Sequence, residues 1–84
     1  MEQVLDEQIK KAREVPIALV LGLSQGRSHK VKCPFHGERT PSCMVYKTGG
    51  FHCFGCGANG QNAIDFLTKM GFSFREAVTE LNNL

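Results

Sequence analysis

The sequence has no run of eighteen apolar residues, which is about the length that a membrane-spanning helix needs. Residues 2–15, after Met1, are rich in charge and do not resemble the apolar segment of a secretory signal. The chain also has no Gly-Lys-Ser/Thr phosphate-binding loop, no evident Ser-His-Asp set and no internal repeat. We therefore expect no membrane association and a cytoplasmic, intracellular location in which the cysteines stay reduced.

The chain is also short. Its 84 residues predict a single domain, 1–84. An apolar core of this size is marginal, so chains of this length often need a disulfide or a metal to hold the fold. A hydrophobic content of 42% argues against disorder, and the net charge of +2 implies no partner by itself.

Two pairs of metal-ligand residues lie in the middle of the chain. Cys33-x-x-His36 is followed, after sixteen residues, by Cys53-x-x-Cys56. Each pair fits a tight turn from which both side chains reach one ion, and two such pairs close a tetrahedral Cys₃His site. The pattern predicts one structural Zn²⁺ bound by these four residues. Because all four ligands come from the protein, no position is left for a reactive water.

Other interpretations of the cysteines are weaker. Two disulfides would suit a secreted chain, and a redox pair at Cys53 and Cys56 would leave Cys33 and His36 unexplained. The remaining candidate ligands are His29, Cys43 and His52. His29 has no partner at knuckle spacing, Cys43 is more simply a small buried apolar residue, and His52 would point away from Cys53 on a strand.

Hydrophobic periodicity predicts an α+β fold, a small zinc ribbon whose three-stranded antiparallel sheet is flanked by helices at both ends. The expected parts are N-terminal helices within 1–23, the zinc ribbon in 27–57 and C-terminal helices in 61–84. The helices expected are 2–14, a short one that opens at Pro16 and ends at Gly22, about 61–70, and 74–84; the strands are 29–32, 42–47 and 50–54, with an exit loop from Gly57 to Gly60. We expect Met70, Phe74 and Leu84 on buried helix faces.

Positive charge is concentrated around the first ligand pair. Residues 27–47 contain five Lys or Arg residues and one acidic residue, Glu38. Such clustering is typical of a phosphate-facing surface, although lysines that keep a sheet edge from pairing would give the same pattern. The candidate nucleic-acid contacts are Arg27, Lys30, Lys32, Arg39 and Lys47, together with the rings of Tyr46 and His52. Alternation places Phe54 on the face of His52, and we expect Phe54 to pack under the zinc knuckle.

The stretches CPFHGERTPS and FHCFGCGANG, with the later Ala63-Ile64-Asp65-Phe66 and Phe74-x-Glu76-Ala77, carry a resemblance. They are similar to the zinc-binding domain of bacterial and phage DnaG-type DNA primases, and weaker similarity extends upstream to about Val15. Two positions depart from that family's pattern. Cys43 stands where the family usually has Phe, and Gln61 follows Gly60 where an acidic residue is usual.

This resemblance implies a module that binds single-stranded DNA and helps to choose where a primer starts. Primer synthesis itself needs clustered carboxylates that hold magnesium ions. Only Glu38 and Asp65 lie near the centre of this chain, and Asp65 is better explained as a solvated or capping residue. We therefore expect a binding module and not an enzyme, acting with a catalytic primase, helicase or polymerase partner on another chain or as the N-terminal part of a longer protein.

Two other classes of function fit the sequence less well. A protein-binding adaptor would dock on a primase, helicase or polymerase without touching DNA. It would expose an uncharged apolar sheet face in place of a basic and aromatic one. A thiol redox enzyme would use Cys53 and Cys56 and would lose zinc as these two residues oxidise reversibly.

Overall fold

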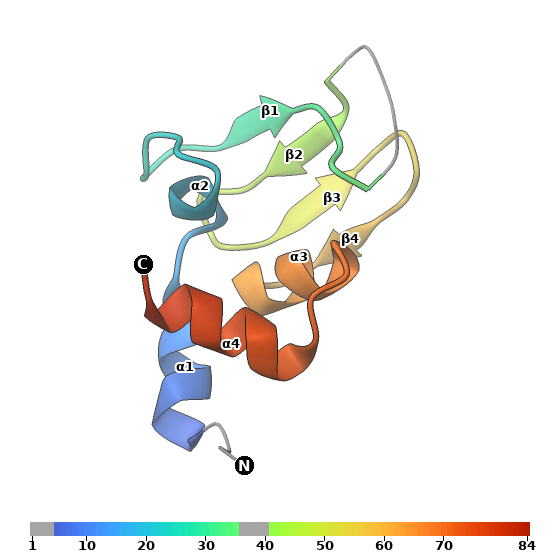
Figure 1. The fold of residues 1–84 in the computed structure, drawn as a ribbon. Coiled ribbons are helices and arrows are strands. Elements are labelled where there is room, and N and C mark those ends of the chain that lie inside the picture. The colour runs from blue at the N-terminus through green and yellow to red at the C-terminus, as the bar shows by residue number, and fades with distance from the viewer. Residues whose placement is uncertain (1–4, 36–40) are drawn as a thin grey trace.

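A computed structural model describes residues 5–35 and 41–84, in which a small sheet lies against a group of packed helices (Figure 1). The sheet lies in the upper part of Figure 1, and α1, α3 and α4 lie below it. In chain order the elements are α1 (Asp6–Glu14), α2 (Ile17–Val20), β1 (His29–Val31), β2 (Cys43–Val45), β3 (Phe51–Cys53), β4 (Asn59–Gly60), α3 (Ala63–Lys69) and α4 (Phe74–Asn82). The predicted α+β zinc-ribbon class is confirmed. Within the described ranges, no helix is long and apolar enough to cross a membrane.

The N-terminal helices follow from two local signals. The acidic residues Asp6 and Glu7 lie in the first turn of α1 and Lys11 and Arg13 in its last, an order that favours the helix dipole. Pro16 separates the two helices, because the residue before a proline avoids helical backbone angles. It caps α2 with extended backbone angles, so this helix begins one residue later than the sequence predicts.

The sheet is antiparallel, with its strands in the order β1-β2-β3-β4. The hairpin between β2 and β3 turns at Gly49, whose φ of 110° suits a residue without a side chain. The structure adds a fourth strand that the sequence analysis placed in the exit loop. Residues 59–60 pair with β3, and Phe51 lies opposite Gly60. A Cβ atom at Gly60 would lie 2.6 Å from the Phe51 ring and 2.6 Å from Asp65 Cβ, so this approach depends on glycine.

Three phenylalanine rings join the sheet to the helical part of the core. Phe51 of β3 and Phe66 of α3 meet edge to face with their ring centroids 5.1 Å apart. Phe35, just after the first cysteine, closes the triangle at 5.6 Å from Phe51 and 5.4 Å from Phe66. Such aromatic contacts add to the hydrophobic stabilisation of burial. The metal-ligand loop is therefore packed directly on the domain's main core.

Hydrogen-bonded caps determine where the last two helices begin. Ser73 and Glu76 form a capping box, the arrangement that Ser followed three residues later by Glu favours, with Glu76 N donating to Ser73 Oγ at 3.1 Å and Ser73 N donating to Glu76 Oε1 at 2.9 Å. Asn62 caps α3, and Asp65 accepts a hydrogen bond from Gln61 N at 2.9 Å. Asp65 is thus a capping residue, as its sequence context suggested.

Three apolar residues that were expected on buried helix faces are instead exposed. Phe74, Met70 and Leu84 all keep more than a third of their surface in contact with solvent. Phe74 is the first residue of α4, Met70 follows the last residue of α3, and Leu84 lies beyond the end of α4. All three are at helix ends, whereas the middle of α4 supplies the buried residues Ala77, Val78 and Leu81.

Candidate metal centre and nucleic-acid interface

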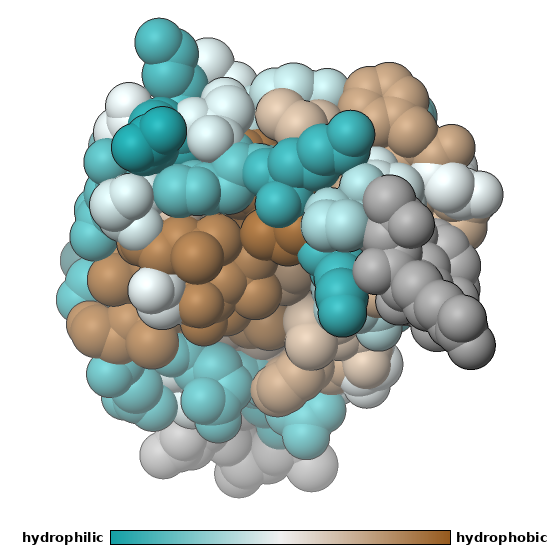
Figure 2. Space-filling view, turned by 90° about the horizontal axis from the view of Figure 1, so that it is seen from above, coloured by the Kyte–Doolittle hydropathy of each residue, from teal (hydrophilic) through white to brown (hydrophobic). Residues whose placement is uncertain are grey.

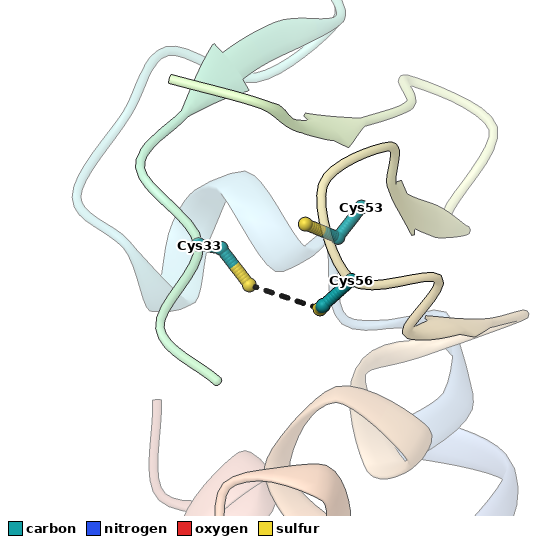
Figure 3. A group of neighbouring side chains, drawn as sticks. All are labelled: Cys33, Cys53 and Cys56. Atoms are coloured by element: carbon teal, nitrogen blue, oxygen red, sulfur yellow. Dashed lines mark hydrogen bonds between the residues drawn. The ribbon is translucent and has the colours of Figure 1, made fainter. Parts of the chain in front are cut away.

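Three cysteine sulfur atoms converge between the end of β1 and the turn after β3 (Figure 3). The Sγ atoms of Cys33, Cys53 and Cys56 all lie within 4.8 Å of one another. Cys53 is the last residue of β3, and a turn closed by the 2.8 Å hydrogen bond from Gly57 N to Cys53 O carries Cys56 back toward it. Gly57 adopts a φ of 81° there, a backbone conformation that favours glycine.

The spacing of the sulfur atoms suits a tetrahedral zinc ion. Zinc–thiolate bonds of about 2.3 Å at tetrahedral angles separate two sulfur ligands by about 3.8 Å. The Sγ atoms of Cys33 and Cys56 are 3.7 Å apart. None of the four cysteines, all of them in the described part of the chain, forms a disulfide. The donor set therefore fits a metal held by thiolates, and His36, the fourth predicted ligand, lies outside the described residues.

The surroundings of Cys53 favour the thiolate form. Burial raises the pKa of this thiol, but hydrogen bonds outweigh the burial and lower the pKa to about 6. The hydrogen bonds involve the Ser42 side chain, the Cys56 backbone, the Cys33 side chain and the Gly55 backbone. Ser42 Oγ lies 3.4 Å from the sulfur. Because zinc binds the deprotonated thiol, this environment prepares Cys53 to be a ligand at neutral pH.

The other candidate ligands lie apart from the cluster, as the sequence suggested. His29 Nε2 is 2.7 Å from the carbonyl oxygen of Ser24 and so is held by the preceding loop. Cys43 is completely buried and belongs to the hydrophobic core. His52 precedes Cys53 on β3 and is only partly buried, between two fully buried neighbours. The outward direction of His52 follows from the alternation of side chains along a strand.

A row of side chains that includes Met44 crosses the outer face of the sheet. Lys30 pairs with Met44, Met44 with His52, and His52 with Asn59, so one residue from each of the four strands stands in register. Residues that alternate with this row, Cys43, Val45, Phe51 and Cys53, are buried on the other face. The outer face thus combines a cation with an imidazole ring and a thioether.

Phe54 does not pack under the zinc knuckle, where the sequence predicts it. Instead, 67% of its surface is exposed. Its ring meets His52 edge on, with the centroids 4.5 Å apart. The strand alternation that pairs Phe54 with His52 and opposes it to Cys53 already contained this signal. Once Cys53 points inward to the sulfur cluster, Phe54 has to point outward.

Four of the five predicted cationic contacts are exposed on or near β1 and β2. Lys30 on β1 and Lys32 just after it are both exposed, and Arg27 is exposed in the preceding loop. Lys47 is also exposed, and its backbone N donates to Ser28 Oγ at 3.1 Å. Tyr46 directly follows β2, and about one-third of its surface is exposed. Arg39 lies outside the described residues.

Comparison with known proteins gives a family match over nearly the whole chain. The family model of the CHC2 zinc finger matches residues 2–84. A DNA primase of Halalkalibacterium halodurans is 44% identical over an alignment that covers 95% of this chain and 14% of the relative. Those of Chlamydia trachomatis and Escherichia coli K12 are 56% and 52% identical, covering 63% and 68% of this chain. The chain spans about a tenth of the length of these relatives.

The fold has a counterpart among solved structures. A crystal structure of the Aquifex aeolicus primase, with its zinc-binding and RNA polymerase domains, matches 95% of this chain with a TM-score of 0.72 and 32% sequence identity. This chain covers 21% of that one. The matched family, the sulfur cluster and the fold all indicate that the bound metal is zinc. The chain therefore belongs to the CHC2 zinc-finger family, as a zinc-binding domain of the DnaG-type DNA primases.

Proposed function

We propose that this chain binds single-stranded DNA on the outer face of its sheet and takes part in template recognition during primer initiation. The observation that carries the proposal is the row of Lys30, Met44 and His52 with Phe54 exposed beside it. A surface that offers both a cation and aromatic rings suits a strand whose bases are unpaired. The similarity to DNA primases supports the same ligand.

Zinc has a structural role in this proposal. Cys33, His36, Cys53 and Cys56 would hold the ion, and bound zinc supplies a rigid link between the end of β1 and the end of β3. These are the strands that carry Lys30 and His52. With four protein ligands the ion has no open position, so the metal orders the DNA-binding surface and activates no water.

Each part of the surface has a separate task. Lys30 and Lys32 would contact phosphates, joined by Arg27, Lys47 and the predicted contact Arg39. Phe54, His52 and Tyr46 would stack against bases, and such stacking is worth roughly 1–3 kcal/mol per base. Because every base has a flat face, stacking alone gives affinity with little sequence preference, and the phosphate contacts make that affinity sensitive to salt.

The catalytic step would belong to a different part of the replication machinery. The chain matches the zinc-binding part of its relatives, and its central region has only two carboxylates. We infer that it is a binding module of the single domain 1–84, without a catalytic site of its own. A primase, helicase or polymerase would be its protein partner. A cytoplasmic location stays a prediction.

Fluorescence anisotropy of the zinc-loaded chain with a mixed-sequence single-stranded oligonucleotide, across a salt series, tests this function. We expect log affinity to fall linearly with log salt. The variant with Lys30→Ala and Lys32→Ala should bind more weakly, with the slope reduced by about 0.7 for each phosphate that the protein no longer neutralises. The matched control is Lys10→Ala with Lys11→Ala, which removes the same charge from α1. Equal weakening in both double variants would reject the outer face, and no binding at low salt would favour a protein-binding adaptor.

A further inference from the structure

An apolar groove lies between the helices, on elements that take no part in the proposed DNA surface. It has a volume of about 290 Å³. Its apolar lining consists of Val20, Leu67, Met70, Phe72, Leu81 and Leu84. These residues come from α2, α3, α4 and the segments that follow α3 and α4, and none of them lies on a strand. The groove is therefore a feature of the helical part alone.

The groove continues into exposed hydrophobic surface. Met70, Phe72 and Leu84 are exposed at its rim, and Leu19 of α2 is exposed beside Val20. Figure 2 shows hydrophobic side chains gathered over the α2 side of the molecule and bordered by hydrophilic ones. Exposed apolar surface of this kind, rimmed by polar groups, is typical of an interaction site.

One charged residue belongs to the lining. Glu80 of α4 is exposed and faces the groove among apolar side chains. A carboxylate in that position selects against an acidic partner and attracts a Lys or Arg side chain. The size of the groove adds a second constraint. Since a cavity of about 150 Å³ holds one benzene ring, a volume near 290 Å³ suits about two large side chains.

We propose that this groove binds an amphipathic helix of a protein partner, which inserts two large apolar side chains one helical turn apart and places a Lys or Arg beside Glu80. Side chains at i and i+3 or i+4 share one face of a helix, the arrangement with which helices fill hydrophobic grooves. The groove is a surface distinct from the DNA-binding face, so binding at the groove does not depend on DNA binding at the sheet.

The test uses a synthetic helical peptide of about 18 residues, long enough to be partly helical. One version has two Leu residues at i and i+4 with a flanking Arg, and the other has Glu in place of that Arg. Each is titrated into the zinc-loaded, ¹⁵N-labelled chain and followed by NMR. We expect shifts at the amides of Leu67, Met70 and Leu84, and an affinity for the Arg peptide about threefold to fivefold higher than for the Glu peptide.

Three substitutions at exposed positions make the test specific. Glu80→Lys should reverse the preference between the peptides, whereas Glu14→Lys, with the same charge change outside the groove lining, should leave it unaltered. Leu84→Ser should lower the affinity of the chain for both peptides several-fold. Absence of shifts at the groove, equal affinity for both peptides, or sedimentation as a dimer that buries the groove would overturn the proposal.

Discussion

Cys43 lies directly opposite Cys53 in the pairing of β2 with β3, and both side chains are fully buried on the same face. The next pair along the strands, Ser42 with Phe54, is joined by the hydrogen bond from Phe54 N to Ser42 O. Because the two pair types alternate, Cys43 and Cys53 form a non-hydrogen-bonded pair, in which side chains lie closer. Only Cys53 joins the sulfur cluster with Cys33 and Cys56. Two adjacent thiols therefore have different roles, one in the core and one at the metal centre.

Substitution of Cys53 should weaken zinc binding, whereas substitution of Cys43 should not. Cys43→Ala should keep one zinc per chain and forfeit only the stability of a small core side chain. Cys53→Ala should release zinc to a chelator at concentrations that leave the wild type loaded. Structural zinc contributes apparent binding energies of about 10–16 kcal/mol in finger peptides, so removal of the ion should also abolish the ordered strands. A metal-sensitive dye measures the zinc, and NMR reports the strands; equal zinc release in both variants would place Cys43 among the ligands.

Phe51 and Phe54, which lie on either side of His52 in the sequence, should respond differently to substitution. Phe51→Ala removes a ring from the centre of the core and should cost about 3–5 kcal/mol of unfolding free energy. Phe54→Ala should change stability by less than about 0.5 kcal/mol, because its ring is largely exposed. The same variant should weaken binding of single-stranded DNA. Thermal unfolding and anisotropy measure the two effects, and a strongly destabilised Phe54→Ala protein would contradict the outward position of this ring.

Gly60 should be intolerant of even a methyl group. In Gly60→Ala the new Cβ would lie 2.6 Å from both Phe51 and Asp65, and relief of that overlap requires the core or the cap of α3 to move. We expect a destabilisation of about 1–3 kcal/mol in thermal or denaturant unfolding. Asn59→Ala, at the exposed neighbouring position, is the control and should be nearly neutral. If both variants unfold alike, the close approach of Phe51 to β4 is not what constrains Gly60.

The capping box of α4 should make a small, pH-dependent contribution to stability. Ser73→Ala should cost about 1 kcal/mol. The pKa of Glu76 is lowered by its hydrogen bond with the Ser73 backbone and then by the Ser73 side chain. A lowered folded-state pKa gives stability that is fully present above the ordinary glutamate pKa of about 4.3 and is lost as pH falls through the folded value.

Wild type and Glu76→Gln, compared at saturating zinc, test the sign of that contribution. Their difference in melting temperature should be constant from about pH 7 to pH 5 and should shrink below the ordinary glutamate pKa of about 4.3. Subtraction of the two curves removes the acid sensitivity that the metal centre confers on both proteins. A difference that grows on acidification would have the wrong sign for a depressed carboxyl pKa.

Features that depend on a few neighbouring residues could be predicted from the sequence. The spacing of Cys53 and Cys56, the Ser73–Glu76 capping box and the glycine turn at Gly49 each involve groups within a few positions of one another. Chain stereochemistry alone confines such groups to a few arrangements. For the same reason the α+β zinc-ribbon class and the main helices and strands were predictable.

Features that depend on distant elements required the tertiary structure. Whether Phe54 or Phe51 is buried depends on which sheet face α3 covers, and the pairing of residues 59–60 with β3 depends on the fit of Phe51 against Gly60. The groove around Glu80 exists only because α2, α3 and α4 meet there. An amphipathic pattern identifies an apolar face, but the neighbours in space decide how much of that face is covered, and this left Met70 and Leu84 exposed.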